Sequence, residues 1–373
     1  KRPTLSARYN LLTYSEQFDN AAWAKSGTTI TANATTAPDA TTTADELFST
    51  AGGTAYIETS SGSLTSGVLY TQSVYAKANT ANYICISSRW DGATSSSRTW
   101  FNLSTGERTA GLPSPTVSIT SAGDGWYRIT MTRTWVTTNV FRIFITNSPS
   151  AIASATGESI YLWGADLRPA DQDDIAYQRV TTATDYDTVG FKPYLSFDGV
   201  DDAMATNSID FSAGDKMTVF AGLRKISDGG AVAGLSAAWF VNNGTFELLA
   251  GNVSTGAGPY WSSASKGAAT WSAAQAVDTT ATYDAPRTDV LASAHDISGD
   301  STNLRINGSS IGTATADKGT GNFGNYPFYI GARGGTELYY KGYLYSLIVR
   351  AAESTATDIT NTETWVNGKT GAY

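Results

Sequence analysis

The sequence contains one cysteine and one histidine among 373 residues. With Cys85 alone, no intrachain disulfide and no cluster of thiolate metal ligands can form. With His295 alone, a histidine-rich metal site is excluded, and at most one Ser-His-Asp arrangement is conceivable. Both residues stand in apolar runs, at 83–86 and 290–297, and we interpret each as a packed strand residue.

Charge is also scarce, at 16% of residues, and acidic residues outnumber basic ones by 33 to 25. The resulting net charge of −8 disfavours binding to a phosphate backbone, so we expect no nucleic acid partner. No apolar run approaches the roughly 18 residues that a membrane-spanning helix needs, so we expect no membrane insertion. Residues 1–6 lack the apolar stretch of a signal peptide, so the sequence does not predict export by that route.

What the sequence has in abundance is glycine, threonine, serine and aromatic residues, including 36 Gly, 20 Tyr and 10 Trp. Turn formers combined with β-branched and aromatic residues predict many short antiparallel strands. Residues 126–135 alternate between apolar and polar positions, as a strand with one face in water does. We predict further strands in the first half near residues 53–60, 68–77, 82–90, 98–103, 115–121, 139–146 and 158–168.

Periodicity is lost between residues 169 and 191, and we place a domain boundary in this stretch. The sequence therefore predicts an all-β fold of two antiparallel β-sandwich (jelly-roll) domains in tandem, residues 1–182 and 183–373. A helix is expected only at residues 354–368, with Thr355 as its N-cap. The strands predicted in the second half are residues 194–197, 216–225, 239–242, 245–251, 288–297, 303–307, 328–333 and 340–350.

The first half resembles a jelly-roll domain that is frequent in phage and prophage tail proteins. The likeness begins at residues 10–23 (NLLTYSEQFDNAAW) and continues in order at 70–77 (YTQSVYAK), 125–129 (GWYRI) and 160–167 (IYLWGADL). That domain is in turn similar to xylan- and glucan-binding modules. The resemblance implies a domain of the carbohydrate-binding type.

The second half resembles a laminin-G-like, concanavalin-A-like lectin domain, at residues 195–202 (LSFDGVDD), 303–308 (NLRING), 340–349 (YKGYLYSLIV) and 365–371 (WVNGKTG). Together the two resemblances imply a receptor-binding or tail fibre protein of a bacteriophage. They imply a virion protein that is assembled in the host cytoplasm, with a host cell-surface polysaccharide and other phage tail proteins as partners. By analogy they also imply a homotrimer.

We expect carbohydrate recognition without catalysis, and we name no catalytic residue. Concanavalin-like glucanases carry a Glu-x-Asp-x-x-Glu strand that places acid and nucleophile on one face, and the sequence has no such strand. Two alternatives stay open. The chain is a structural spacer or assembly protein of the tail, or a polysaccharide depolymerase whose carboxylates come from distant parts of the sequence.

Calcium is the one metal that the composition favours, because oxygen ligands abound and soft ligands are missing. In the first half, the resemblance implies a structural calcium ion held by Glu16 and Asp166. In the second half, Asp198, Asp201 and Asp202 gather around Gly199 and form a second candidate site. The alternative for this cluster is an Asp-Gly turn in which the carboxylates cap backbone amides.

Sugar rings stack on aromatic side chains, and the best candidates stand in expected loops or at strand ends. They are Trp90 and Trp100 in the first half, and Tyr260, Trp261 and Trp271 in the second. The last three lie in residues 251–276, the longest stretch without periodicity, and long loops on a rigid sandwich tend to carry recognition sites.

Overall fold

The computed structural model describes residues 1–6, 9–61, 64–88, 98–111, 116–137, 140–172, 176–182, 192–237 and 241–373. It divides into two compact units, Arg8–Phe191 (the N-terminal unit) and Lys192–Tyr373 together with Lys1–Ala7 (the C-terminal unit). The division falls at residues 191 and 192 rather than 182 and 183. Lys1–Ala7 group with the C-terminal unit because β1 (Thr4–Ser6) pairs with β16 (Tyr194–Asp198).

Two six-stranded antiparallel sheets build the N-terminal unit, and a small pair, β14 (Ala153–Ser154) with β5 (Gly53–Thr54), lies beside them. The first, which we call the β8 sheet, has the order β10 (Glu107–Gly111), β9 (Arg98–Asn102), β8 (Tyr83–Ser88), β13 (Val140–Thr146), β6 (Tyr56–Ser60) and β2 (Ala24–Ser26). The second, the β7 sheet, has the order β11 (Thr116–Gly123), β12 (Trp126–Thr134), β7 (Leu69–Ala78), β15 (Ser159–Pro169), β4 (Ala44–Ser49) and β3 (Thr28–Thr35). A short 3-10 helix, η1 (Ala170–Gln172), follows β15.

The core of this unit comes from alternate residues of both sheets. Ile84 and Ile86 of the β8 sheet and Val74 and Ile129 of the β7 sheet belong to one buried cluster, which Trp23 also joins. Because side chains alternate between the faces of a strand, the residues between these positions point away from the core. The positions of the core residues therefore identify which residues of each strand lie on the outer face of its sheet.

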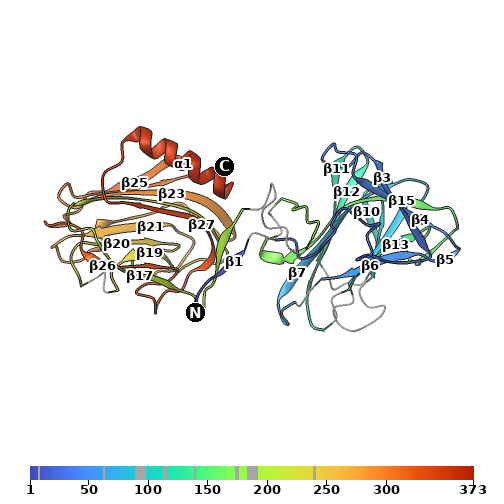
Figure 1. Cartoon of the computed structure of the whole chain (residues 1–373), viewed down its shortest axis with the longest axis horizontal. Helices are drawn as coiled ribbons and strands as arrows, with labels where there is room; N and C mark the ends of the chain where they lie inside the picture. The colour runs from blue at the N-terminus through green and yellow to red at the C-terminus, as the bar shows by residue number, and fades with distance from the viewer. Residues whose placement is uncertain are drawn as a thin grey trace. The chain divides into compact units, whose positions relative to one another are not determined.

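The C-terminal unit is a second sandwich (Figure 1). Its seven-stranded β18 sheet has the order β1, β16, β27 (Lys341–Arg350), β18 (Lys216–Lys225), β23 (Arg287–Asp296), β24 (Ser301–Ile306) and β25 (Ser309–Ala314). Its six-stranded β20 sheet has the order β17 (Met204–Asp210), β26 (Asn325–Ile330), β19 (Ala231–Leu235), β20 (Thr245–Leu249), β21 (Ser262–Lys266) and β22 (Ala276–Asp278), with η2 (Ala273–Gln275) before β22.

One α-helix is present in the described residues, α1 (Ala356–Thr370), and it lies on the outer face of the β18 sheet (Figure 1). Thr355 caps its first turn and forms a reciprocal capping box with Asp358. The helix ends at Gly371, whose left-handed backbone (φ 71°) allows its N–H to reach the carbonyl of Asn367. This helix is not long and apolar enough to cross a membrane.

The prediction of an all-β fold with antiparallel sandwiches and a C-terminal helix is confirmed. Predicted strand 216–225 coincides with β18, and most other predicted strands agree to within a few residues. The stretch 251–276 is corrected, because it contains the buried strand β21. Its Ser and Ala residues are small enough to pack in the interior, but they carry no apolar periodicity that would reveal a strand.

Candidate functional site

Four neighbouring strands of the β8 sheet carry a row of side chains across its outer face. The register places Phe144 opposite Cys85 on one side and opposite Tyr56 on the other, and Cys85 opposite Trp100. Residues directly opposite each other in antiparallel strands share one face. Since Ile84 belongs to the core, this row faces outward, and we call Trp100, Phe144 and Tyr56 the aromatic row.

A second row runs beside the aromatic row and brings charge to it. Arg142 lies opposite Glu58, and its Nε donates to Glu58 Oε2 at 2.7 Å. Its guanidinium carbon lies 4.2 Å from the centre of the Tyr56 ring, and that of Arg98 lies 5.5 Å from the centre of the Phe144 ring. Cation–π interactions of this kind favour the placement of the guanidinium groups over the rings. Tyr56 and Trp100 stay half-buried.

Trp100 is held in a fixed orientation by the loop after β13. Its indole Nε1 donates to the carbonyl of Ala151 at 2.6 Å, and Thr146 Oγ1 donates to the same carbonyl at 2.7 Å. Thr109 Oγ1 ties the same loop to β10 through the carbonyl of Pro149, at 2.8 Å. The indole N–H, the only polar group of the side chain, is therefore already hydrogen-bonded. A ligand would contact the apolar surface of the ring.

The outer face of the β8 sheet thus combines aromatic carbon with paired charged groups. Aromatic rings present apolar surface to C–H groups, whereas the Arg142–Glu58 pair offers both donors and acceptors. Such a surface suits a neutral ligand that carries hydroxyl groups on one edge and C–H groups on a face. Neighbouring strands lie about 4.8 Å apart, so the aromatic row extends over roughly 14 Å from Trp100 to Tyr56.

The other predicted aromatic residues in the described part of the chain belong to the C-terminal unit. Trp90 lies outside the described residues. Trp261 is fully buried, with its Nε1 donating to Asp289 Oδ2 at 2.9 Å and the Lys225 ammonium 4.9 Å from its ring centre. The prediction that Trp261 contacts sugar is therefore wrong, because its ring packs inside the sandwich.

Tyr260 and Trp271 are half-buried in the C-terminal unit. Trp271 packs against a small buried cluster that lies outside the main core. The members of that cluster are Ala231, Leu249, Val253 and Ala264. Tyr260 and Trp271 remain candidate binding residues. Among the predicted aromatic residues that the structure describes, Trp100 is the one that shares a sheet face with other rings.

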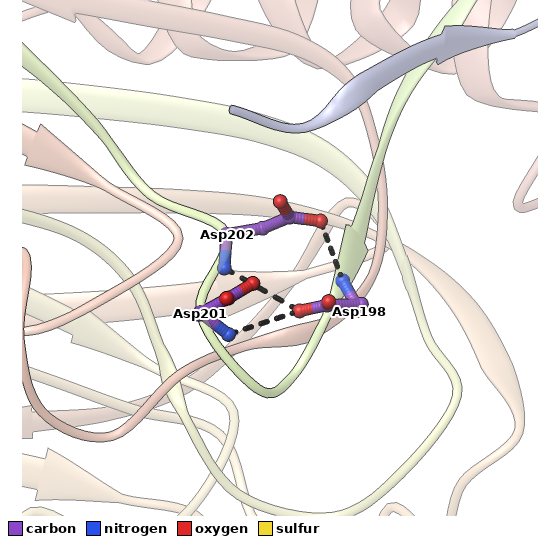
Figure 2. Close-up of side chains that lie close together, drawn as sticks. All are labelled: Asp198, Asp201 and Asp202. Atoms are coloured by element: carbon purple, nitrogen blue, oxygen red, sulfur yellow. Dashed lines mark hydrogen bonds between the residues drawn. The ribbon is translucent and has the colours of Figure 1, made fainter. Parts of the chain in front are cut away.

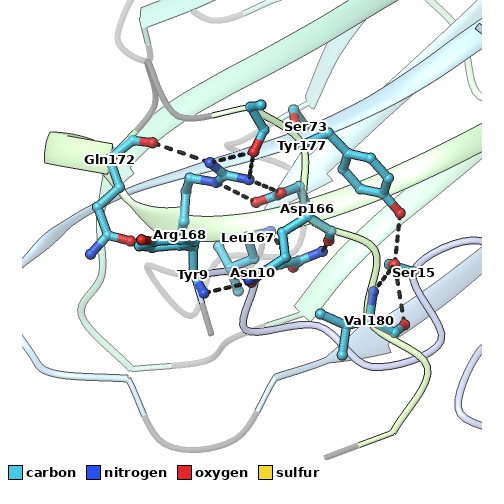
Figure 3. A network of polar contacts seen from close by, with 12 residues as sticks. Tyr9, Asn10, Ser15, Ser73, Asp166, Leu167, Arg168, Gln172, Tyr177 and Val180 are labelled. Carbon is cyan, nitrogen blue, oxygen red and sulfur yellow. Dashed lines mark hydrogen bonds and ion pairs between the residues drawn. The ribbon is translucent and has the colours of Figure 1, made fainter. Parts of the chain in front are cut away.

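The carboxylate of Asp166, for which the sequence predicts a metal role, forms an ion pair with an arginine (Figure 3). Arg168 donates from Nε to Asp166 Oδ1 at 2.8 Å and from Nη2 to the other oxygen, and it also reaches the carbonyl of Gln172. Both side chains are almost fully buried, so the guanidinium is the internal counter-ion. Glu16 forms an ion pair with Arg179, whose Nε lies 3.2 Å from Glu16 Oε2. Burial is the main cause that raises the pKa of Glu16.

Asp198, Asp201 and Asp202 lie together as predicted, with carboxylate oxygens within 4.8 Å of one another (Figure 2). Asp198 Oδ1 accepts from the backbone N–H of Val200 at 2.8 Å and of Asp201 at 3.2 Å. These hydrogen bonds, that of Val200 first, lower the pKa of Asp198. Lys1 Nζ lies 2.9 Å from Asp201 Oδ2. The carboxylate oxygens are suitable ligands for a hard cation. The hydrogen bonds that they accept are those of a capped Asp-Gly turn.

His295 is a core residue, in agreement with the sequence interpretation. Its Nε2 lies 2.8 Å from Ser293 Oγ, and its ring meets Phe246 edge to face with centres 4.9 Å apart. Burial first, and then Lys318, lowers the pKa of His295 to about 3, so the imidazole is neutral at physiological pH. Residues 308–312 match a Gly-x-Ser-x-Gly pattern, but Ser310 lies in a β-hairpin strand, where its Oγ accepts from Asn303.

Sequence reasoning missed Tyr56, Glu58, Arg98, Arg142 and Phe144. These residues come from three strands spread between positions 56 and 144, and only their register brings them together. The local signal was present in β13, where Arg142 and Phe144 are two residues apart and share a face. Phe144 lies on the outer face but is buried beneath the guanidinium groups. Since Phe141, Ile143 and Ile145 are apolar on the other face, the run of apolar residues resembles an interior strand.

Comparisons with known proteins place the chain in no family. No protein-family model and no curated protein matches it. Among solved structures, the heptameric SAP-like pentraxin from Limulus polyphemus matches with 14% identity, 45% of this chain and 80% of that chain covered, and a TM-score of 0.36. The CBM40 of the Ruminococcus gnavus IT-sialidase matches with 12% identity, coverage of 43% and 98%, and a TM-score of 0.31.

The binding domain of botulinum neurotoxin serotype G matches with 10% identity and a TM-score of 0.35. The match covers 47% of this chain, and the chain spans 43% of that structure. At these identities and TM-scores the likenesses carry no inference about function. The function therefore has to be inferred from this chain's own residues.

Proposed function

We propose that the protein recognises carbohydrate through the outer face of the β8 sheet, without catalysis. The observation that carries the proposal is the pair of half-buried rings, Trp100 and Tyr56, which share the outer face with the Arg142–Glu58 pair on either side of the buried Phe144. A sugar ring offers C–H groups to an aromatic ring and hydroxyl groups to charged side chains at its edge. The anchored indole of Trp100 supports the proposal, because a ring fixed in place loses little entropy when a ligand binds.

The pairing of Arg142 and the net charge of the chain favour a neutral glycan over an anionic polymer. Arg142 is paired with Glu58, and the chain as a whole carries a net charge of −8. A nucleic acid site would show unpaired basic groups aligned with a phosphate backbone. Neutral polysaccharide is therefore the ligand class that we propose.

The finer proposal is that the protein is a bacteriophage tail adhesion protein and that the glycan is a host cell-surface polysaccharide. This proposal rests on the resemblance of both halves to tail and lectin-like domains. Several copies in one virion, as in a homotrimer, would make weak single sites sufficient through avidity. The partners are then other phage tail proteins, and the location is the virion.

The pairing of buried carboxylates supports a role without catalysis. Arg333 binds Glu247 in a bidentate manner, with Nε and Nη2 each donating to one carboxylate oxygen at 2.7 Å. Asp289 is bound by Arg287, and Glu363 by Arg305. A glycosidase needs one carboxyl group held protonated and a second free to act as nucleophile or base. These three carboxylates, held by arginines, fit neither role.

A glycan array tests the proposal, with the full chain and two variants in each of which one tryptophan is replaced by alanine. We expect binding to at least one bacterial surface polysaccharide, lost by about tenfold or more in Trp100→Ala, which corresponds to about 1.4 kcal/mol. Trp365→Ala is the matched control, because Trp365 is 54% exposed on α1 in the other unit. Equal binding by Trp100→Ala would refute the proposed face. An array without any bound glycan would favour the structural alternative, and release of reducing ends would favour the depolymerase.

A further inference from the structure

A pocket of about 260 Å³ lies between the outer face of the β18 sheet and the start of α1, in the C-terminal unit. Its floor is a row across three strands, because Thr218 lies opposite Ala294 and Ala294 opposite Asn303. Its wall is formed by Glu353, Ser354 and Ile359, from the turn after β27 and the first turns of α1. The pocket lies just below the lower end of the roughly 300–1,000 Å³ typical of small-molecule sites, so it has room for about one small ring.

The wall is fastened to the floor. Thr218 Oγ1 donates to the carbonyl of Ala352 at 3.0 Å, directly before the wall residues. Arg350 Nη1 donates to Ser354 Oγ at 3.1 Å, and Thr355 and Asp358 form the capping box of α1. The pocket is therefore built from connected elements and needs no rearrangement to exist.

Three polar groups of the lining are available to a ligand. Asn303 Nδ2 donates to Ser310 Oγ, to the carbonyl of Gly312 and to Thr313 Oγ1, at 2.9–3.1 Å, which uses its donors. Its Oδ1, the hydroxyl of Ser301 and the carboxylate of Glu353 have no hydrogen bond or ion pair within the part of the chain that the structure describes. The free groups are thus mainly acceptors.

The remaining charge in the pocket is balanced. Asp296 lies opposite Lys216 in the sheet and forms an ion pair with it, and it also accepts from the backbone N–H of Gly299 at 2.8 Å. The carboxylates of Asp296 and Glu353 do not converge with a third metal ligand among the described residues. A metal ion therefore does not fit, and the single unpaired carboxylate makes the pocket unsuited to phosphate.

We propose that this pocket binds a single monosaccharide unit, as a second carbohydrate site separate from the aromatic face. The hydroxyl groups of a hexose donate to Glu353, Asn303 Oδ1 and Ser301, and its C–H groups contact Ala294 and Ile359. A sugar hydroxyl both donates and accepts, so it satisfies Ser301 and the acceptors at once. The proposal goes beyond the face on the N-terminal unit and does not depend on it.

The test is titration of the full chain, labelled for amide NMR, with D-glucose, D-galactose, D-mannose and N-acetyl-D-glucosamine in turn. We expect at least one sugar to shift the amide signals of Ser301, Asn303 and Glu353 in a saturable way. In Glu353→Ala the dissociation constant rises by about tenfold or more. Glu337→Ala is the matched control, since Glu337 is an exposed glutamate of the same unit outside the pocket. Trp100→Ala leaves the shifts unchanged, which separates this site from the aromatic face.

Glu353 is exposed, so its removal does not threaten folding. A second variant, Ala294→Leu, fills the floor and abolishes the shifts while the α1 signals keep their native positions. Saturable shifts confined to other regions would overturn the proposal, as would the absence of shifts with all four sugars. Equal affinity of Glu353→Ala and the native chain would also overturn it.

Discussion

The two units differ in what covers the outer face of a sheet. In the C-terminal unit, α1 covers the β18 sheet, and Val366 packs against Phe220, Val290 and Ala292. At Gly222 a Cβ atom would lie 2.0 Å from Thr370 Oγ1, so the helix approaches the strand too closely for any side chain. In the N-terminal unit, the outer face of the β8 sheet keeps Trp100 and Tyr56 half-exposed. Aromatic surface that a chain does not cover itself is where an external ligand is expected.

The units also differ in their response to acid, because each buries a different titratable group. His295 is neutral in the C-terminal core, with its pKa lowered to about 3 by burial first. Asp45 is buried in the N-terminal unit, and burial raises its pKa to about 6, although the N–H groups of Phe18 and Asn33 donate to it. Burial disfavours the charged form of both side chains. Protonation at low pH makes the histidine positively charged, whereas it makes the aspartate neutral. The two groups therefore act on stability in opposite directions.

The largest effect that we predict is the loss of stability on breaking a buried ion pair in the N-terminal unit, compared with an exposed pair in the C-terminal unit. Arg168→Met leaves the buried Asp166 without a counter-ion and lowers the free energy of unfolding of the N-terminal unit by about 3–5 kcal/mol. Arg350→Met breaks the solvent-exposed pair with Asp358 and has a much smaller effect on unfolding. Hydrogen exchange read by mass spectrometry reports each unit separately. Equal losses in the two variants would contradict the assignment of Arg168 as an internal counter-ion.

The second prediction concerns His295. A base whose pKa is lowered in the folded state contributes stability above its unfolded pKa, near 6.5, and loses it as the pH falls toward about 3. Between about pH 7 and pH 4.5 we expect the C-terminal unit to lose about 3 kcal/mol through this group. His295→Gln keeps a polar contact to Ser293 and removes that loss. An unchanged pH dependence in the variant would show that His295 is not the group responsible.

The third prediction concerns Asp45 and has the opposite sign. An acid whose pKa is raised in the folded state stabilises most below its unfolded pKa, near 4, and the contribution is lost as the pH rises through about 6. The N-terminal unit should therefore gain about 2 kcal/mol from this group between about pH 6.5 and pH 4.5. Asp45→Asn flattens this dependence, whereas the exposed Asp39→Asn leaves it in place. A gain that survives in Asp45→Asn would assign it to another carboxyl group.

The smallest effect that we predict is that of calcium. Asp198 Oδ1 is engaged by backbone N–H groups, Lys1 pairs with Asp201, and Arg168 pairs with Asp166. We therefore expect a millimolar excess of calcium to leave the unfolding of both units unchanged. Stabilisation of the C-terminal unit that saturates with calcium and disappears in Asp198→Asn would assign a cation to the cluster of Asp198, Asp201 and Asp202.

Local sequence patterns predicted the parts of the fold that depend on local rules. The strand β18 follows from a run of apolar residues, and α1 follows from the Thr355–Asp358 capping box. The helix extends past the predicted end at Gly368 because Gly371, not Gly368, takes the left-handed conformation. The strands β3 and β17 were missed because their Thr-, Ala- and Asn-rich sequences are largely exposed and carry little apolar periodicity.

The candidate site was predictable only in part, because it depends on strand register. Trp100 was predicted to stand in a loop or at a strand end, and it lies within the strand β9, on the outer face. Tyr56 and Arg142 share this face through strand pairings that a local pattern does not contain. Trp261 looked equally suitable in sequence, but its partner Asp289, on another sheet, gives the indole N–H a buried acceptor. Burial of an aromatic residue in this fold is decided by such distant partners.

The most direct test of carbohydrate recognition is NMR of the full chain, observing the indole N–H of Trp100 while a glycan that the protein binds is added. We predict saturable shifts of this signal together with the amides of Tyr56 and Arg142, and no change in the indole signal of Trp261, which is buried in the other unit. Saturable glycan binding that leaves Trp100, Tyr56 and Arg142 unchanged would contradict the assignment of this face as the binding site.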